Sequence, residues 1–474
     1  MTAVVDFLNG ILWGYVLVYG LLAVGVYFTV RLGLPQIRHF AEMFRVIRSA
    51  PQTDVAGITP FQALTVSLAS RVGTGNLAGV AVALYLGGAG AIFWMWIVAL
   101  VGMATAYVES TLAQLYKVKN QDGQYRGGPA FYIARGLNSK LAAALFSIAL
   151  ILSFGLVFNA VQANAIASAV EGAFGVPQLA TGIVVAAVAG VVIFGGIPQI
   201  ARVASYIVPF MAIAYVLVAL VVLALNIGEV PAMLATIVQS AFGLEPAAGG
   251  VTGGITAAML NGVKRGLFSN EAGMGSAPNI AACATPQPHH PSSQGFVQAL
   301  GVFIDTLVIC TVTALIILLS GVFEPGSGMT GTKLTQAALA DHIGVAGDYF
   351  IALAILFFAF TSIIGNYSYA ENALTYWGLG GRTPVMILRV AVLAMVIWGT
   401  LQTVQTVFNT ADASMGLMAT INLVAIVLLS GTVVKLTRDY FAQRRAGQEP
   451  QFHGRDYPEL ANKVEHDIWW RARR

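Results

Sequence analysis

Two apolar stretches of the chain are each interrupted by glycine and polar residues. The first reads SLASRVGTGN over residues 67–76, and the second reads NEAGMGS over residues 270–276. Because a single glycine costs a helix about 1 kcal/mol relative to alanine, both stretches are predicted to unwind there. Unwound backbone exposes N–H groups that suit a carboxylate and carbonyl groups that suit a cation. Together they could hold a zwitterion and a sodium ion with few charged side chains.

Ionisable residues are rare within the apolar stretches, and each is unfavourable there unless it is paired or hydrated. They are Arg71, Glu109, Lys264, Arg265, Glu271, Asp305, Glu371 and Asp412. Glu271 lies at the second interruption, and we expect it to pair with Arg71 or Lys264. Such an ion pair could open and close as a gate, or it could be a static contact that pins the two interruptions together.

The composition indicates a membrane protein. Of the 474 residues, 57% are hydrophobic and 10% are charged, whereas a soluble protein carries about 25% charged residues. A membrane-spanning helix needs about 20 apolar residues. By that measure eleven stretches are predicted to span, near residues 5–30, 61–86, 90–116, 141–170, 178–196, 203–226, 251–277, 296–321, 347–377, 385–405 and 411–434. The chain is therefore expected to be an all-α polytopic membrane protein.

The basic residues indicate how the chain is oriented, because Lys and Arg mark the cytoplasmic side of a membrane protein. When the N-terminus is placed outside, nearly all of the 25 basic residues fall on the cytoplasmic side, and Lys333 falls outside. We expect the N-terminus outside and the C-terminus in the cytoplasm of a bacterial cell, with the chain in the inner membrane. The net charge of +4 is dispersed, which indicates no nucleic-acid partner.

The spans fall into two groups of five. The expected parts are an N-terminal helix with an interfacial helix (1–60), the first group (61–226), an external connecting segment (227–250), the second group (251–434) and a charged cytoplasmic tail (435–474). Matching interruptions in two halves indicate a transporter with inverted repeats and a site at the membrane midplane. The tail is expected either to rest on the anionic inner leaflet through Trp469 and Trp470 or to be partly disordered.

Five blocks of the sequence resemble the sodium:alanine symporter family, whose members are also called alanine or glycine:cation symporters. The blocks are GGAGAIFWMWIVALVG at 87–102, VGTGN at 72–76, YRGGPAFY at 125–132, FSNEAGMGSAP at 268–278 and FTSIIGN at 360–366. The resemblance covers essentially all of residues 60–430. It implies a leucine-transporter-like five-plus-five inverted repeat, preceded by one extra N-terminal helix, with about eleven transmembrane helices.

The resemblance also implies the activity. Such proteins import a small neutral amino acid, alanine or glycine, in symport with sodium by alternating access. Proton coupling, or another small amino acid such as serine, is the alternative. The implied partners are the amino acid, the sodium ion and membrane lipid, with no cofactor. A repeat within one chain does not require a second subunit, so a monomer is compatible with it.

The resemblance places the substrate and the ion beside the two interruptions. The residues it implies for the substrate are Gly73, Thr74, Gly75 and Asn76 for the carboxylate, Phe158 and Gln162 from the span at 141–170, Gly273, Met274 and Gly275 at the side-chain end, and Asn366 at the border. The sodium ligands it implies are the carbonyl oxygens of Ala69 and Val72 and the hydroxyl groups of Thr361 and Ser362.

The motifs argue against two other classes of function. The sequence contains no HExxH, GxSxG or paired-aspartate motif of a membrane-embedded enzyme. His289 and His290 lie in PQPHHP, which is predicted to be a cytoplasmic turn rather than a metal site. A channel would need a symmetric ring or a repeated filter sequence. Uptake that saturates and depends on a sodium gradient would distinguish a symporter from a channel, and product analysis would detect an enzyme.

Overall fold

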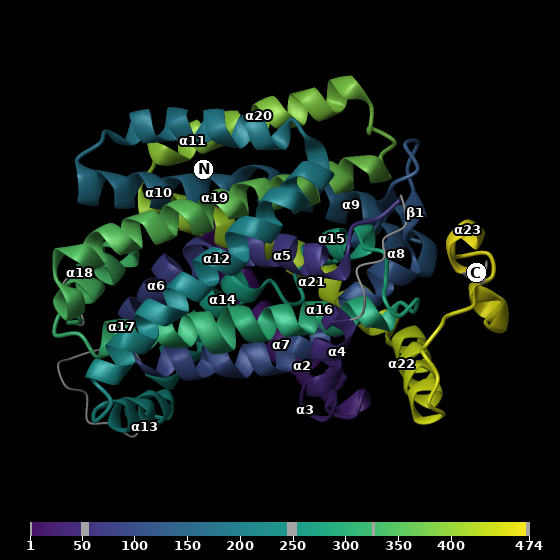
Figure 1. The fold of residues 1–474 in the computed structure, drawn as a ribbon, viewed down its shortest axis with the longest axis horizontal. Helices are drawn as coiled ribbons and strands as arrows, with labels where there is room; N and C mark the ends of the chain where they lie inside the picture. Colours follow the sequence, from purple (N-terminus) through teal and green to yellow (C-terminus); the bar gives the residue numbers. More distant parts are fainter. Residues whose placement is uncertain (1, 49–55, 244–253, 325–327, 471–474) are drawn as a thin grey trace.

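The computed structural model describes residues 2–48, 56–243, 254–324 and 328–470, and these ranges are almost entirely helical (Figure 1). Eight helices among the described residues are long and apolar enough to cross a membrane. Helices suit this environment because each satisfies its backbone polar groups within its own segment. The described part also contains a two-stranded antiparallel sheet, in which β1 (Val118–Lys119) pairs with β2 (Tyr125–Arg126).

The N-terminal helix contains a candidate membrane span from Val4 to Arg31. It consists of α1 (Thr2–Ile11), a π-helical segment η1 (Leu12–Leu17) and α2 (Val18–Arg31). It packs against α7 (Gly90–Leu115). Two short helices follow where the sequence predicts an interfacial helix, namely α3 (Pro35–Arg38) and α4 (Phe40–Arg48).

The predicted span at 61–86 is broken. It consists of α5 (Pro60–Arg71), a π-helical turn η2 (Gly75–Gly79) and α6 (Val80–Gly87). A capping box starts α5, because the Thr59 hydroxyl accepts the Gln62 N–H and the Gln62 side chain accepts the Thr59 N–H. The helix stops at Arg71, since Val72 leaves the helical conformation with φ −76° and ψ 89°. The unwinding predicted from the glycines is confirmed at this position.

The predicted span at 251–277 is also broken, and its first three residues lie outside the described ranges. α14 (Ile255–Asn270) ends at Glu271, which has a left-handed φ of 59°, and α15 (Pro278–Cys283) follows an unwound segment. Gly273 and Gly275 have φ angles of 91° and 80°. Residues with a Cβ rarely adopt such angles, so the second break depends on these two glycines.

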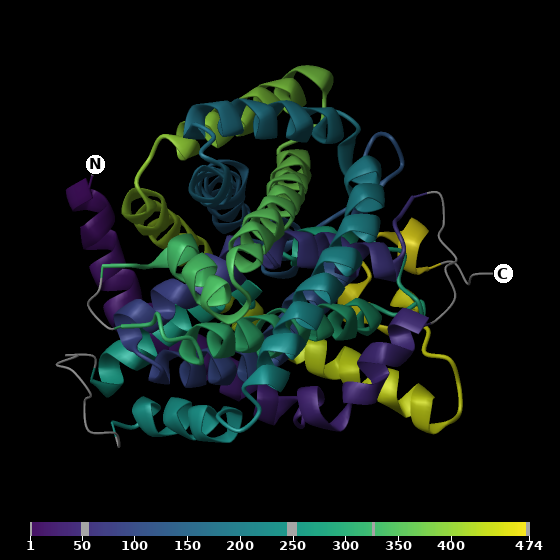
Figure 2. The ribbon, with the colours of Figure 1, turned by 60° about the vertical axis from the view of Figure 1, so that its left-hand side comes forward.

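The other helices surround the two broken ones. In the first half they are α8 (Pro129–Gly136), α9 (Lys140–Leu150) continuing through η3 (Ile151–Val157) into α10 (Phe158–Phe174), α11 (Gln178–Ile193), α12 (Gly196–Leu225) and α13 (Val230–Ala241). In the second half they are α16 (Ser292–Val302) continuing through η4 (Phe303–Cys310) into α17 (Thr311–Leu318), α18 (Gly331–Ile343), α19 (Val345–Tyr376), α20 (Arg382–Thr400) and α21 (Val404–Leu428). α10 packs against α19 and α20, and Figure 2 shows it nearly end on.

The C-terminal tail folds back onto one end of the helices, beside α8 and β1 (Figure 1). It consists of α22 (Ser430–Arg445), two 3₁₀ turns η5 (Gly454–Asp456) and η6 (Pro458–Leu460), and α23 (His466–Trp469). Trp469 is fully buried, and its indole N–H donates to the Leu115 carbonyl at 3.0 Å. The prediction of contact with the leaflet is therefore wrong for Trp469, which is buried against the protein, and disorder is wrong for the described part of the tail. Trp470 is partly exposed, and its contact with the leaflet stays a prediction.

Candidate functional site

At the first break, side chains bind the backbone N–H groups that have no helical partner. Gln162 Oε1 accepts hydrogen bonds from the Thr74 N–H at 3.0 Å and from the Thr74 hydroxyl at 2.7 Å. Asn76 Oδ1 accepts the Gly73 N–H at 3.0 Å. A Cβ on Gly73 would overlap the Ser362 hydroxyl and lie 2.8 Å from Gln162 Oε1. Two donors thus converge on one oxygen, in a place that only glycine leaves open.

The hydroxyl group of Ser362 lies at the carboxyl end of α5. It lies 2.8 Å from the Ala69 carbonyl and 3.0 Å from the Phe358 carbonyl, as a donor to either. The Thr361 hydroxyl donates to the same Phe358 carbonyl at 2.9 Å. Because α5 ends before Val72, the last carbonyl groups of the helix have no helical partner. The structure thus brings Ala69 and Ser362 together, whereas Thr361 bonds within its own helix.

A buried polar chain links the two breaks. The Ser70 hydroxyl lies 2.7 Å from Glu271 Oε1 and 2.6 Å from Asn366 Oδ1, and it donates its one proton to either oxygen. Asn366 in turn donates to Asn159 Oδ1 at 3.1 Å. Glu271 also accepts the Ser276 hydroxyl at 2.5 Å. Glu271 occupies a left-handed position at a helix end, where glycine is usual, so its side-chain contacts rather than backbone preference explain a glutamate there.

The ion pair predicted at the breaks is not formed. Among the described residues, neither Glu271 nor Arg71 takes part in an ion pair. Lys264 pairs instead with Asp412 Oδ2 at 2.7 Å, and Arg265 pairs with the same oxygen at 2.5 Å. Lys264 precedes Glu271 by about two helical turns, so its side chain reaches α21 rather than the break. Arg71 donates to the Gln298 carbonyl at 3.2 Å.

Three phenylalanines connect this ion pair to the first break. The Phe158 and Phe268 rings stack at 4.8 Å, and the Phe268 and Phe408 rings are 5.2 Å apart. The Arg265 guanidinium lies 5.1 Å from the centre of the Phe408 ring and 5.6 Å from that of Phe268. A Cβ on Gly75 would lie 3.2 Å from the Phe268 ring. Gly75 and Phe158, both predicted for the substrate, therefore meet at this aromatic layer.

The second break is bound by a carboxylate of the protein itself. Glu109 of α7 is fully buried and accepts the N–H groups of Gly273 at 3.2 Å and Gly275 at 3.1 Å, together with the Asn422 amide at 2.8 Å. Met274 is fully buried, and its N–H donates to the Glu271 carbonyl at 3.1 Å. Within the described part of the chain, Gly273, Met274 and Gly275 form no hydrogen bond with Gln162, so the structure does not join them to the first break in that way.

Another buried carboxylate, Asp305 of η4, lies beside the first break. Its Oδ1 accepts the Asn76 amide at 2.7 Å, and its Oδ2 accepts the hydroxyl groups of Ser269 at 2.8 Å and Thr306 at 2.7 Å. Among the described residues, Asp305 forms no ion pair with a basic side chain. Asn76 thus holds Gly73 through its oxygen and Asp305 through its nitrogen.

Glu109, Asp305 and Asp412 contact the two breaks or their ion pair but were not among the predicted site residues. Their signal was present, because a carboxylate inside an apolar span is unfavourable unless it has a partner. The aromatic layer had no comparable signal, since Phe268 and Phe408 look like ordinary apolar residues in an apolar sequence. Only the packing of α14 against α21 brings them together.

The comparisons with known proteins concern nearly the whole chain. The amino-acid carrier protein AlsT of Bacillus subtilis (strain 168) is 49% identical, over 95% of this chain and 94% of that protein. The probable sodium/glutamine symporter GlnT of the same strain is 48% identical, over 95% and 93%. A crystal structure of a mutant of the Eremococcus coleocola manganese transporter has a TM-score of 0.55 and 13% identity over 80% of this chain and 79% of that one, which shows similarity of fold.

A sequence profile described as the sodium:alanine symporter family matches residues 1–454. That range includes both broken helices, the aromatic layer and the buried carboxylates. With relatives nearly half identical over almost their full lengths, the chain belongs to the sodium:alanine symporter family and is a multi-pass membrane transporter, not an enzyme.

Proposed function

We propose that this transporter imports a small neutral amino acid, alanine or glycine, in symport with sodium by alternating access. The family supports cation-coupled amino-acid symport, and the arrangement at the first break carries the finer proposal. There the N–H and hydroxyl groups of Thr74 both donate to the amide oxygen of Gln162. A substrate carboxylate replaces this neutral acceptor with a charged one, and hydrogen bonds to charged groups are roughly twice as strong.

We infer that the sodium ion binds between the first break and α19. The Ser362 hydroxyl and the Ala69 carbonyl, 2.8 Å apart, are two of its proposed ligands. Both are hard oxygen groups, which suit a hard cation. The Val72 carbonyl and the Thr361 hydroxyl complete the set, with the Thr361 hydroxyl turning away from Phe358 when the ion binds.

The proposed architecture is a five-plus-five inverted repeat with one extra N-terminal helix, eleven spans in all. The two broken helices support it, since each lies first in its half of the chain, at 61–226 and at 251–434. The eight long apolar helices account for most of the spans. The distribution of basic residues supports an external N-terminus and a cytoplasmic C-terminus in a bacterial inner membrane.

In this orientation the outer side of the site is closed. The aromatic layer of Phe158, Phe268 and Phe408 covers the first break, and the Arg265–Asp412 pair lies against it. Opening toward the outside requires these rings to separate and the ion pair to shift with α14 or α21. Lys264 binds the same Asp412 oxygen. Arg265 can therefore separate from Asp412 while Lys264 still neutralises the carboxylate.

A larger neutral amino acid, glutamine, is the second candidate substrate, because a relative with 48% identity is named as a probable sodium/glutamine symporter. Proton coupling is the alternative to sodium. The buried Asp305, which forms no ion pair among the described residues, supports that alternative, since a proton would neutralise it.

Uptake into proteoliposomes tests the proposal. Labelled alanine, glycine and glutamine are offered under inward sodium, potassium or proton gradients. We expect alanine or glycine to accumulate only under the sodium gradient. Accumulation driven by protons alone would contradict the proposed sodium site at Ser362. Accumulation of glutamine without alanine or glycine would contradict the proposal that the substrate is a small amino acid.

A further inference from the structure

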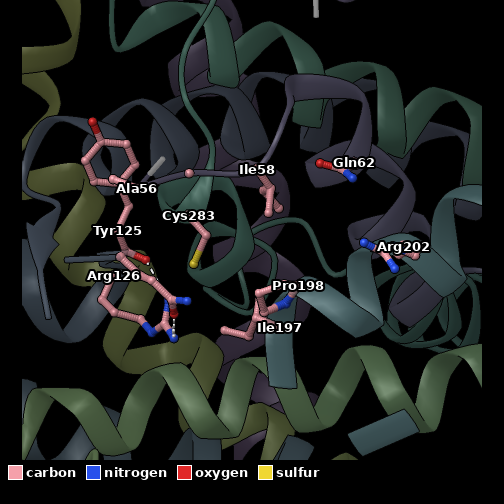
Figure 3. Close-up of a pocket in the computed structure, with 11 residues that line it drawn as sticks. Ala56, Ile58, Gln62, Tyr125, Arg126, Ile197, Pro198, Arg202 and Cys283 are labelled. Carbon is pink, nitrogen blue, oxygen red and sulfur yellow. Dashed lines mark hydrogen bonds between the residues drawn. The ribbon is translucent and has the colours of Figure 1, made fainter. Parts of the chain in front are cut away.

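A cavity of about 250 Å³ lies at the far ends of both broken helices, away from the central site. Gln62 at the start of α5 and Cys283 at the end of α15 line it. Arg126 of β2 and Arg202 of α12 line it as well, and Figure 3 shows Cys283 close to Arg126, with Arg202 on the opposite side. In the proposed orientation this is the cytoplasmic end, where a transported molecule leaves.

Arg126 is buried with an unused hydrogen-bond donor. Its side chain is only 7% exposed. Two of its nitrogens donate, to the Tyr125 carbonyl at 3.0 Å and to Gln124 Oε1 at 2.8 Å, whereas Nε has no partner among the described residues. Its acidic neighbour, Glu371, lies 3.8 Å away. A buried N–H without an acceptor is unfavourable, so this cavity wall is suited to an anionic ligand.

The charge around the cavity is positive. Glu371 is shared with two other groups, because it accepts the Tyr367 hydroxyl at 2.5 Å and lies 4.0 Å from the Arg389 guanidinium. The positive charge of Arg126 is therefore only partly neutralised by Glu371. Arg202 adds a second, exposed cation. A pocket lined by cations raises the local concentration of small anions.

We propose that this cavity is a release site for the transported amino acid, in which the Arg126 guanidinium binds the substrate carboxylate. The inference rests on the proposed function. The volume of about 250 Å³ lies below the roughly 300–1,000 Å³ of sites for drug-sized ligands, so it suits a small amino acid. α5 and α15 pack together between the first break and this cavity. A substrate that leaves Thr74 between these half-helices meets Arg126 before it reaches the cytoplasm.

Cys283 provides a direct test, because it lines the cavity and the chain has one other cysteine, Cys310. In the full-length C310A protein, reconstituted so that the cytoplasmic end faces the medium, the rate of Cys283 alkylation by N-ethylmaleimide is measured. We expect alanine to slow the alkylation. Alaninamide, which lacks the carboxylate, is expected to have no effect.

Three variants in the C310A protein assign this protection to Arg126. R126Q is expected to need roughly tenfold more alanine for the same protection, which corresponds to about 1.4 kcal/mol. R126K keeps the charge and is expected to retain most of the protection, which separates loss of the anion partner from loss of the fold. K119Q removes a cation of the paired strand β1 that does not line the cavity, and its protection is expected to equal that of the parent protein.

The Q162A variant distinguishes the release site from the central site. Protection that persists in Q162A and is lost in R126Q supports the release site. Protection that is lost in Q162A and unchanged in R126Q arises at the central site and overturns the inference, although sodium-driven uptake by the wild type would still support the proposed function. Absence of alanine uptake by the wild type under every gradient overturns both.

Discussion

In the proposed site, Gln162 accepts the hydrogen bonds of the first break until a substrate carboxylate takes its place. Its oxygen accepts both Thr74 donors, and its amide N–H₂ group can turn to a carboxylate that takes its place. Q162A removes this charge-assisted contact, which contributes about 1.5–3 kcal/mol. We therefore expect half-saturating alanine to rise at least about tenfold in uptake assays. Unchanged uptake with normal membrane insertion would remove Gln162 from the site.

The matched variant Q162E keeps the size of the side chain but adds a charge. A fixed carboxylate beside Thr74 would occupy the two donors and repel the carboxylate of the substrate. Q162E is expected to show no alanine uptake at any concentration that can be tested, while Q162A still transports at high alanine. Alanine uptake by Q162E equal to that of the wild type would contradict this account.

In the proposed site, the Ser362 hydroxyl binds the sodium ion rather than the amino acid. S362A removes the hydroxyl that lies 2.8 Å from the Ala69 carbonyl, and we expect the sodium concentration for half-maximal uptake to rise several-fold. Half-saturating alanine at saturating sodium should change less. S368A on the same helix is the control, because the Ser368 hydroxyl bonds back to the Gly365 carbonyl. A sodium dependence that S362A leaves unmoved would reject the cation site.

At the scale of elements, α14 and α21 are joined by Asp412 of α21, which pairs with both Lys264 and Arg265 of α14. D412N would leave Lys264 and Arg265 without their shared carboxylate, and loss of one partner of a buried pair is destabilising by about 3–5 kcal/mol. We expect a clear fall in the melting temperature of the detergent-solubilised protein. The exposed Lys435–Glu459 pair provides the control. The melting temperature of E459Q should equal that of the wild type. Equal melting of D412N and the wild type would mean that the pair does not hold α14 to α21.

The breaks themselves could be predicted from the sequence, but their partners could not. Gly73, Gly75, Gly273 and Gly275 are local signals, because a missing Cβ acts on the backbone at its own position. Ion pairing is different, since it depends on which face of α14 meets which helix. Lys264 therefore pairs with Asp412 instead of with Glu271, and Glu109 binds the second break from α7.

At the scale of the whole molecule, the tail packs against the loop that follows α15 at one end of the helices. His290 in this loop is buried, faces Asp439 of α22 at 3.3 Å and packs against the rings of Tyr440 and Phe452. Its Nδ1 accepts the Ser292 N–H at 3.1 Å, so the neutral tautomer has a partner on each ring nitrogen. The tail and the loop therefore fit together best when His290 carries no charge.

Acid should loosen this contact. Burial lowers the pKa of His290 below its usual 6.5, although Asp439 acts in the opposite direction. The docked state thus binds fewer protons than the undocked state, and the stability of docking is retained above pH 6.5 and lost as pH falls below it. Trypsin cleavage of the tail should accelerate over that range.

The control for this pH dependence is H290Q. After correction for trypsin activity, its tail should be cleaved at a rate that does not vary with pH across the same window. H453Q, which replaces a histidine of the tail outside the Asp439 contact, should respond as the wild type does. An equal pH response in H290Q and the wild type would assign the loosening to another group.

Trp469 of the tail fills a buried position against α7, and its partner Leu115 lies 354 residues earlier in the chain. The end of the molecule that the tail covers can therefore be completed only after all the helices between α7 and the tail have been synthesised. A stop codon just after α22 would yield a protein that keeps every long apolar helix of the described residues but lacks the cover at this end. The tail thus creates a physical difference between a chain that contains residues 446–470 and one truncated before them, and a protease that reaches this end of the molecule can act on that difference.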